Sequence, residues 1–437
     1  MGCCHHFAPT EGGASSFTVE MPRVTFGRGC LSELGERAAG LGLKRVALFT
    51  DPFLRDGLQM AIATQALRRS GLDHAIFDAI RIEPDQHCVD EASRFLREGG
   101  FDGVVSVGGG SVMDTAKAAM LYALYPADFL DYFGPPVGGG LAVPVPGPVL
   151  PHIACPTTAG TGSETTGLSV LRINQLDCKF VIGSRHLMPD EALIDPACID
   201  TLPRRILTSS SFDLMSHALE CYTARAYTQW PEVADPMARP MIQGANPWSD
   251  IHAREALRIV GQYLVRGVTD AEDHEARDKL MWAASLAGMA FGNSGTHLPH
   301  ALSYAITHLV KDRATDDYPV AAPFVPHGIS VIVNAPSVFR FTASAAPARH
   351  LDAARYLGAD TRDASEDDAG EILAGRMIEL MAATDMPNGI GDVGFGVGDA
   401  TRLADSAHRQ RRAIGNAPRE TKFEDIEHIF RHAVSYW

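Results

Sequence analysis

The sequence predicts an α/β domain followed by an all-α domain. The first observation is that short β-rich runs alternate with amphipathic stretches in the first half of the chain, which is the pattern of parallel βαβ units. The second is that helical periodicity extends from about Thr208 almost to the end of the chain. The third is the length, because 437 residues suffice for two large domains.

The elements of the first half come in the order that an open, mostly parallel sheet requires. Each expected strand is a short apolar run, and each expected helix has its apolar residues at helical spacing. The expected strands lie at 45–50, 74–78, 104–107, 153–156 and 179–183, and the expected helices at 58–70 and 90–99.

The boundary between the two predicted domains lies near residue 203, where Leu202-Pro203 interrupts the pattern. We expect a flexible polar leader over residues 1–20, in which Cys3, Cys4, His5 and His6 could also hold a stray metal. The α/β domain then covers 21–203 and the helical domain 204–437. Segment 229–249, with four prolines, is expected to be a long ordered loop of the kind that is often functional.

Composition excludes several classes of function. The 38 Lys and Arg residues against 53 Asp and Glu residues give a formal charge of -15, which argues against a nucleic-acid partner. No run of 18 apolar residues exists, so no membrane span is expected. The eight cysteines form no CxxC pair and indicate reduced thiols. With no evident targeting signal we expect a cytoplasmic protein, and a mitochondrial one stays open because transit peptides are easily missed.

A glycine turn follows the expected strand 104–107 and precedes a helix. Gly109 and Gly110 would let the backbone approach a ligand closely, and the new helix presents free N–H groups to an anion. Ser111 and Asp114 are spaced to cap that helix. Because strand, glycines and helix come in this order, we interpret the turn as a phosphate site, although many such turns bind nothing.

A second polar turn, residues 156–166, follows the strand at 153–156. Thr157, Thr158 and Ser163 are small hydroxyl residues that can donate to a phosphate or a carboxamide. Two such turns on one sheet favour a dinucleotide over a single phosphate. Asp51 ends the first strand, where it could meet a ribose hydroxyl and would repel a 2′-phosphate, or it could simply be a turn residue.

Asp213 and His217 are spaced i, i+4 in an apolar helical segment, so they share one buried face. The pair could be an intrahelical hydrogen bond or two ligands of a cation. His297, His300, His308 and His327 follow later in the chain, and spacing alone does not choose between His297 and His300. Three imidazole nitrogens and one carboxylate oxygen suit Fe(II) or Zn(II) with an open position for a substrate oxygen.

From about Thr25 to the C-terminus, the two turns and the Asp/His set together resemble the iron-containing (group III) alcohol dehydrogenases. The resemblance implies a dehydroquinate synthase-like fold, that is, an α/β domain with an all-helical domain. It also implies NAD as cofactor, a divalent iron (or zinc) ion, and a homo-oligomer of two or more chains. The implied cofactor residues are Asp51, Gly109, Gly110, Ser111, Asp114, Thr157, Thr158, Ser163 and Lys179, and the implied metal ligands are Asp213, His217, His300 and His327.

Within that family, the stretches 128–132, 155–167, 182–185, 238–240, 243–247 and 325–328 look most like the hydroxyacid–oxoacid transhydrogenase subgroup. This implies hydride transfer from 4-hydroxybutyrate, through tightly bound NAD, to 2-oxoglutarate. Arg239 and Arg185 are candidates to bind the substrate carboxylates, because an Arg fork binds a carboxylate at two points. Many relatives have a second histidine four residues after the third metal ligand. This chain has Tyr304 there, as a possible proton relay.

Two other enzyme readings stay open at this stage. One is an ordinary NAD-dependent alcohol dehydrogenase that acts on a small primary alcohol or hydroxy acid and releases NADH in each cycle. The other is a metal-dependent lyase of the dehydroquinate synthase type, which would need a strongly cationic pocket. The segment around Tyr304 and the sparse lysines after residue 203 argue against the lyase. A pure binding protein would need neither both turns nor a buried Asp/His set.

Overall fold

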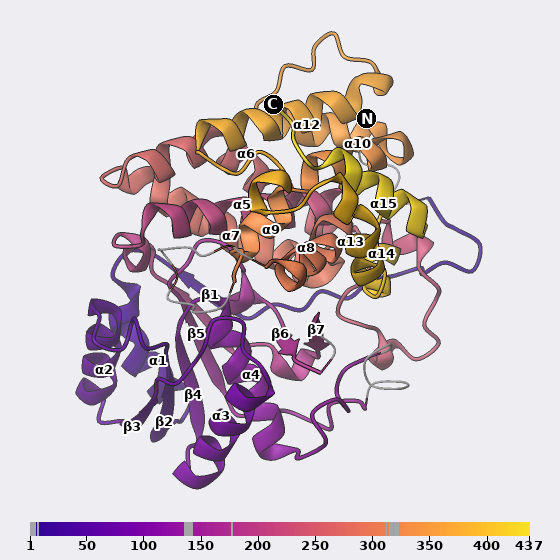
Figure 1. The fold of residues 1–437 in the computed structure, drawn as a ribbon. Helices are drawn as coiled ribbons and strands as arrows, with labels where there is room; N and C mark the ends of the chain where they lie inside the picture. Colours follow the sequence, from indigo (N-terminus) through magenta and orange to yellow (C-terminus); the bar gives the residue numbers. More distant parts are fainter. Residues whose placement is uncertain are drawn as a thin grey trace. The chain divides into compact units, whose positions relative to one another are not determined.

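The computed structural model describes residues 6, 8–134, 143–175, 178–311, 313, 318 and 323–437, so Cys3, Cys4 and His5 of the leader lie outside the described residues. It divides into two compact units, Glu20–Thr201 and Met1–Val19 with Leu202–Trp437. The first holds a parallel α/β sheet and the second is helical, so the predicted fold class is confirmed (Figure 1). Among the described helices, none is both long and apolar enough to cross a membrane.

The sheet of the α/β unit has six parallel strands in the order β1-β8-β5-β4-β2-β3. A separate antiparallel hairpin, β6 with β7, contains the expected strand at 179–183. The strands are β1 Arg23–Phe26, β2 Arg45–Phe49, β3 Asp73–Phe77, β4 Gly103–Gly108, β5 His152–Pro156, β6 Leu168–Ile173, β7 Cys178–Gly183 and β8 Glu191–Ile194.

Helices cover both faces of this sheet, which explains why its central strands are apolar without alternation. Successive side chains of a strand point to opposite faces. Val46 and Leu48 of β2 accordingly pack with helices α1 and α2, whereas Ala47 and Phe49 pack with α3 and α4. The four helices are α1 Leu34–Gly40, α2 Leu58–Arg69, α3 Gln86–Gly99 and α4 Gly110–Leu124.

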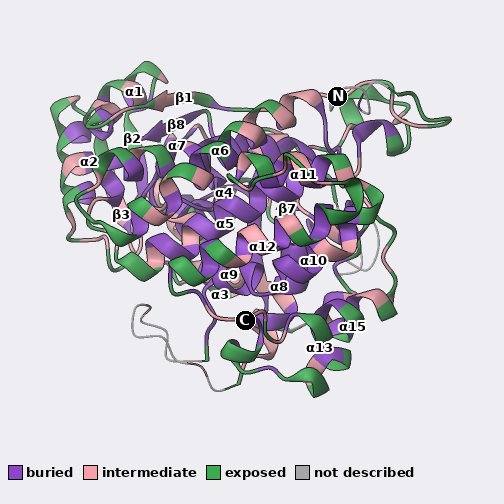
Figure 2. Ribbon diagram, turned by 90° about the horizontal axis from the view of Figure 1, so that it is seen from above, coloured by how far each residue is buried: buried purple, intermediate pink, exposed green. Residues whose placement is uncertain are grey.

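The helical unit is built around α5 (Arg204–Thr223), which packs against α6, α7 and α9 and is buried almost throughout from Leu207 onward (Figure 2). A helix that is enclosed on every side needs no polar face, so polar residues within it require a partner. The other described helices are α6 Pro247–Thr269, α7 His274–Ser294, α8 Leu298–Leu309, α9 His327–Ile332, α10 Ala335–Thr342, α11 Pro347–Tyr356, α12 Ala369–Ala383, α13 Ala400–Ala407, α14 Arg411–Gly415 and α15 Phe423–His432.

The N-terminal segment belongs to the helical unit. Gly13 forms a β-bridge with Pro231, and the N–H of Thr18 donates to Oε1 of Gln243 at 3.0 Å. Both contacts involve the long loop predicted at 229–249, which contains the 3-10 turn Pro236–Ala238 and ends where α6 begins at Pro247. This loop and the N-terminal segment therefore support one another.

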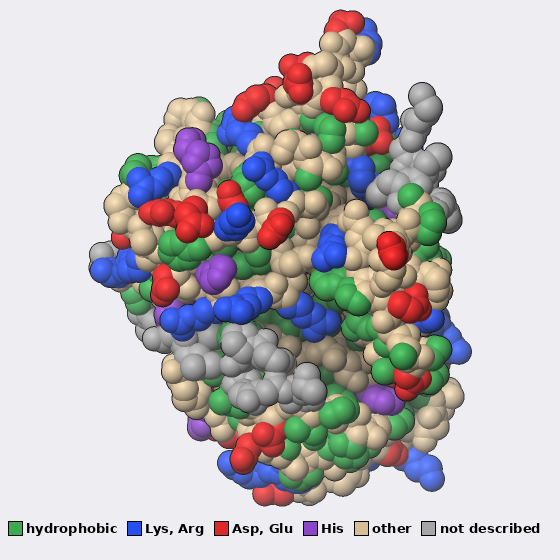
Figure 3. Space-filling view, turned by 90° about the vertical axis from the view of Figure 1, so that its right-hand side faces the viewer, with side chains coloured by type: hydrophobic (Ala, Val, Ile, Leu, Met, Phe, Trp, Pro, Cys, Tyr) green, Lys and Arg blue, Asp and Glu red, His purple; other side chains and the backbone are tan. Residues whose placement is uncertain are grey.

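On the face drawn in Figure 3, acidic and basic side chains are interspersed among uncharged ones.

A buried lysine ties the two polar turns of the α/β unit together. Lys117 of α4 is fully buried, and burial lowers its pKa to about 8. Its Nζ lies within 2.6–2.9 Å of four oxygens, all of them in or just after the second turn. They are the main-chain oxygens of Ser163, Thr166 and Leu168 and the Oγ of Ser163.

We expect Lys117→Met to destabilise the protein by about 3–5 kcal/mol, because the buried Asp114 carboxylate and the turn oxygens would lose their cation. The measurement is urea unfolding followed by circular dichroism, with the exposed Lys44→Met as control. An unfolding midpoint equal to that of the control would show that Lys117 does not hold the turns.

The packing of α9 on α5 depends on a glycine. A Cβ at Gly328 would lie 1.8 Å from the main-chain oxygen of Ser209 in α5. Backbone cannot move aside as a side-chain tip can, so any larger residue must push the two helices apart.

We therefore expect Gly328→Ala to cost about 1–3 kcal/mol of stability through overpacking. Gly375→Ala in α12 is the matched control, because its Cβ would meet nothing within 4 Å and should stabilise the helix by about 0.5–1 kcal/mol. Chemical unfolding of the two variants side by side tests the assignment. Equal stability of both variants would contradict it.

Candidate active site

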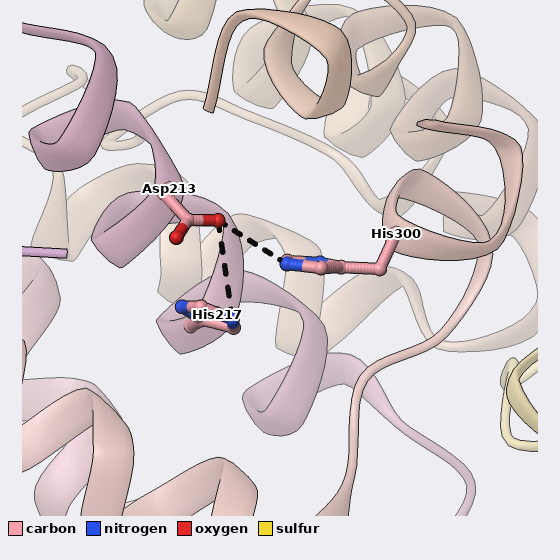
Figure 4. A group of neighbouring side chains, drawn as sticks. All are labelled: Asp213, His217 and His300. Carbon is pink, nitrogen blue, oxygen red and sulfur yellow. Dashed lines mark ion pairs between the residues drawn. The ribbon is translucent and has the colours of Figure 1, made fainter. Parts of the chain in front are cut away.

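Three helices of the helical unit carry the four predicted ligands, of which Asp213, His217 and His300 form one close group and His327 lies beside Asp213. Asp213 and His217 come from α5, His300 from α8 and His327 from the start of α9. The Oδ1 atom of Asp213 lies 3.3 Å from Nε2 of His300, 3.6 Å from Nε2 of His327 and 3.9 Å from Nε2 of His217. Figure 4 shows that the imidazoles of His217 and His300 both point at this oxygen.

The donor set fits a divalent metal ion. The ligand atoms of Asp213, His217 and His300 all lie within 4.8 Å of one another, and all three residues are buried. Two ligand atoms bound about 2.1 Å from one tetrahedral ion lie roughly 3.4 Å apart, close to the spacing seen. Oδ1 of Asp213 and Nε2 of His300 are buried without a well-formed hydrogen bond among the described residues. One cation would satisfy both atoms.

Electrostatics favour the ionised carboxylate. Burial alone would raise the pKa of Asp213, but the imidazoles of His217, His327 and His300 outweigh burial and hold this pKa well below its ordinary value. Burial likewise opposes the charged form of His300, yet the carboxylates of Glu220 and Asp213 raise its pKa to about 10. The centre therefore keeps a negative oxygen available, and a metal ion there could act as a Lewis acid on a substrate oxygen.

His297 takes no part in this group, although its spacing resembled that of His300. Its Nδ1 accepts the N–H of Leu298 at 2.8 Å, and its Nε2 lies 3.0 Å from Oγ1 of Thr223. Both ring nitrogens are thus engaged at the start of α8. Burial also holds the pKa of His297 well below its ordinary value.

The first polar turn lies between β4 and α4, against the second turn. A Cβ at Gly109 would lie 3.3 Å from Cγ2 of Thr158, and one at Gly110 would lie 2.8 Å from Cγ2 of Thr161. A Cβ at Gly110 would therefore force Thr161 to move, whereas one at Gly109 would make only a tight contact with Thr158. Gly162 in the second turn adopts the left-handed conformation at φ 59°, which favours glycine.

The expectation that Ser111 and Asp114 cap α4 is wrong. Gly109 is the N-cap residue and has no side chain to offer. Oγ of Ser111 accepts the N–H of Glu83 at 3.3 Å instead. Asp114 is turned inward, where it accepts from Oγ of Ser163 at 2.7 Å and from the N–H of Val170 at 3.1 Å, and burial raises its pKa. The start of α4 consequently carries no side-chain cap, which suits an anion site.

The other predicted cofactor residues lie at the ends of strands. Thr157 is buried and donates its N–H to the oxygen of Gly108 at 3.0 Å. Oδ1 of Asp51 accepts the N–H groups of Phe53 and Leu54, which is the turn role left open in the sequence. Burial raises the pKa of Asp51.

Lys179 of β7 forms an ion pair with Glu83, a residue that no sequence motif indicated. Its Nζ lies 2.5 Å from Oε1 of Glu83. Glu83 is left-handed at φ 58°, a strained conformation for a residue with a side chain. Because its N–H also binds Ser111, Glu83 links Lys179 to the glycine turn.

The predicted substrate residues lie in different segments of the chain. Arg239 lies in the long loop, where it donates to Oγ of Ser16 at 2.7 Å and to Oγ1 of Thr18 at 3.4 Å. Arg185 of the α/β unit pairs with Glu20 at 3.9 Å. The ring of Tyr304 is nearly parallel to that of His327, with centroids 6.3 Å apart.

Comparison with known proteins covers nearly the whole chain. Residues 22–196 match the family model of the iron-containing alcohol dehydrogenases, and residues 241–434 match the C-terminal model of the same family. The mitochondrial hydroxyacid–oxoacid transhydrogenase of Pongo abelii is 41% identical over 97% of this chain and 90% of its own length.

Solved structures agree with these matches. The alcohol dehydrogenase of Oenococcus oeni superposes with a TM-score of 0.84 at 27% identity, over 96% of this chain and all of its own. The sulfoacetaldehyde reductase of Bifidobacterium kashiwanohense, solved in complex with NAD+, gives 0.79 at 26% identity, over 97% of this chain and all of its own. With both family models matched in order and a full-length relative, the chain belongs to the iron-containing alcohol dehydrogenase family of oxidoreductases that act on CH–OH groups.

Proposed function

We propose that this protein is a hydroxyacid–oxoacid transhydrogenase. It takes a hydride and a proton from 4-hydroxybutyrate, which becomes succinate semialdehyde, and gives both to 2-oxoglutarate, which becomes 2-hydroxyglutarate. The observation that carries the proposal is the 41% identity to a transhydrogenase over 97% of this chain.

The proposal includes one divalent ion and one nicotinamide cofactor. The ion, Fe2+ or alternatively Zn2+, would lower the pKa of the substrate hydroxyl, and NAD would carry the hydride from one substrate to the other. Asp213, His217, His300 and His327 would hold the ion. The family name supports iron, and the NAD+ complex of a relative supports the cofactor.

The uncapped start of α4, with Gly109, Gly110 and Ser111, would bind the phosphates of NAD. Thr157 and Thr158 would donate to the cofactor from the second turn. Asp114 and Ser163 bind one another and so act through the position of that turn. Asp51 would lie near the adenosine ribose, and its carboxylate favours NAD over NADP by repelling a 2′-phosphate. Lys179 would be a further cofactor residue.

Both proposed substrates are carboxylates, so a fixed cation is needed to orient them. Arg239 suits this task because Ser16 and Thr18 hold its guanidinium in place. Arg185 is the second candidate. Tyr304, beside His327, would pass the hydroxyl proton toward solvent. Its ordinary pKa is much higher than that of the histidine found in many relatives.

The rival function is that of an NAD-dependent alcohol dehydrogenase, which releases NADH after each cycle. It is favoured by the likeness to the Oenococcus oeni alcohol dehydrogenase.

We further propose a homo-oligomer and a reducing compartment, cytoplasmic or mitochondrial. The free, buried cysteines Cys30, Cys88, Cys155, Cys198 and Cys221 and the mitochondrial relatives support that compartment.

An assay without added NAD separates the two functions. Purified enzyme given 4-hydroxybutyrate and 2-oxoglutarate should form many equivalents of 2-hydroxyglutarate per bound cofactor, measured by mass spectrometry. The reason is that a retained cofactor is reoxidised by the second substrate in every cycle. Enzyme stripped of metal with a chelator is the control and should be inactive. Turnover that appears only when NAD is added, with release of NADH, would favour the alcohol dehydrogenase.

We expect Arg239→Ala to raise KM for 2-oxoglutarate by roughly tenfold or more, since a hydrogen bond to a charged group contributes about 1.5–3 kcal/mol. Metal content should stay unchanged. Arg362→Ala, at an arginine whose side chain is 86% exposed, is the matched control. Steady-state kinetics with each substrate give the answer, and unchanged KM in Arg239→Ala would remove Arg239 from the substrate site.

A further inference from the structure

Glu220 is a fully buried acid one turn beyond the ligand pair on α5. Its side chain is 0% exposed. The spacing from Asp213 through His217 to Glu220 is i, i+4, i+7, which keeps all three residues on one face of the helix. That face meets the start of α8, where His297 and His300 lie. A buried carboxylate is costly unless partners satisfy its oxygens.

Both oxygens of Glu220 are satisfied by α8. Oε2 accepts the N–H of His297 at 2.7 Å and, more weakly, the N–H of His300 at 3.4 Å. These are the N–H of the N-cap residue and an N–H of the first turn of α8, where a negative charge is also stabilised by the helix dipole. Oε1 lies 2.5 Å from Nδ1 of the His300 ring, within hydrogen-bond distance. One carboxylate therefore anchors both the main chain and the side chain of His300.

We propose that Glu220 is a positioning residue that decides which nitrogen of His300 is free to bind the metal ion. The inference rests on the proposed metal centre. An ionised carboxylate only accepts hydrogen bonds, so Nδ1 of His300 must carry the proton. In a neutral imidazole the other nitrogen, Nε2, then bears the lone pair. This is the nitrogen that faces Oδ1 of Asp213 at 3.3 Å.

The isosteric change Glu220→Gln tests this role because an amide has one accepting and one donating end. If its oxygen keeps the two N–H groups of α8, its NH2 faces Nδ1 of His300. The ring must then move its proton to Nε2, which cannot bind a metal ion in that form. If the amide is turned round, its NH2 faces the N–H groups of α8 and two donors oppose one another. Either arrangement weakens the centre without changing the size of the side chain.

The experiment measures the affinity of the metal-free protein for Zn2+ by competition with a chromogenic chelator. We expect Glu220→Gln to bind Zn2+ on the order of 10- to 100-fold more weakly than the natural protein, which is the usual effect of losing such a support. Glu191→Gln in β8 is the matched control, because it removes the charge of another glutamate whose side chain is only 4% exposed. Its affinity should stay within about twofold of the natural protein.

If Glu220→Gln binds Zn2+ as tightly as the control variant does, the role of Glu220 is overturned. The metal centre itself is not contradicted by that result. Failure of the natural protein to bind Zn2+ overturns the metal centre and this inference together. If Glu220→Gln does not fold, a second measurement tests the role of Glu220. The 15N resonances of the His300 ring are recorded in Zn2+-loaded natural protein and are identified by comparison with His300→Gln. A protonated Nδ1 supports the proposal. A metal-bound Nδ1 overturns it.

Discussion

The centre of the helical unit is organised around the buried carboxylate of Asp213. Asp213 lies in the middle of α5, enclosed by other helices, where an unbalanced carboxylate would be strongly destabilising. Three imidazoles converge on its Oδ1 from three helices. In the absence of an ion, protonated histidine can balance this charge, as the raised pKa of His300 indicates. With an ion, the same atoms become ligands.

The α/β unit also contains a buried carboxylate, and there a buried lysine lies nearby. Asp114 is turned into the protein, and Lys117 lies one helical turn further along α4. Together they bind Ser163 and the oxygens that follow it, so the second turn is held close against the first. Gly110 leaves room for that contact, and no side chain caps the start of α4. A rigid pair of turns orders its groups before a ligand arrives, which lowers the cost of binding.

Much of this could be predicted from the sequence, because periodicity and turn residues are local signals. The alternation of strands and helices and the Asp213–His217 pair are of this kind. The place of β1 beside β8 and the separation of β6 and β7 from the main sheet are long-range pairings that no local pattern carries. His297 and His300 could not be told apart by spacing, since the difference lies in hydrogen bonds to Thr223 and Glu220. The helical spacing of Glu220 from Asp213 could have indicated that Glu220 lies on the same face. No sequence pattern indicated that the side chain of Asp114 points into the protein.

Diffraction at the iron absorption edge, on crystals of active protein purified without chelators, tests the central claim most directly. The account predicts one anomalous peak about 2.0–2.2 Å from Oδ1 of Asp213 and from the Nε2 atoms of His217, His300 and His327. A zinc ion at this point would give its peak at the zinc edge instead. Active crystals with no anomalous peak among these four side chains, or with the peak at another site, would contradict the account.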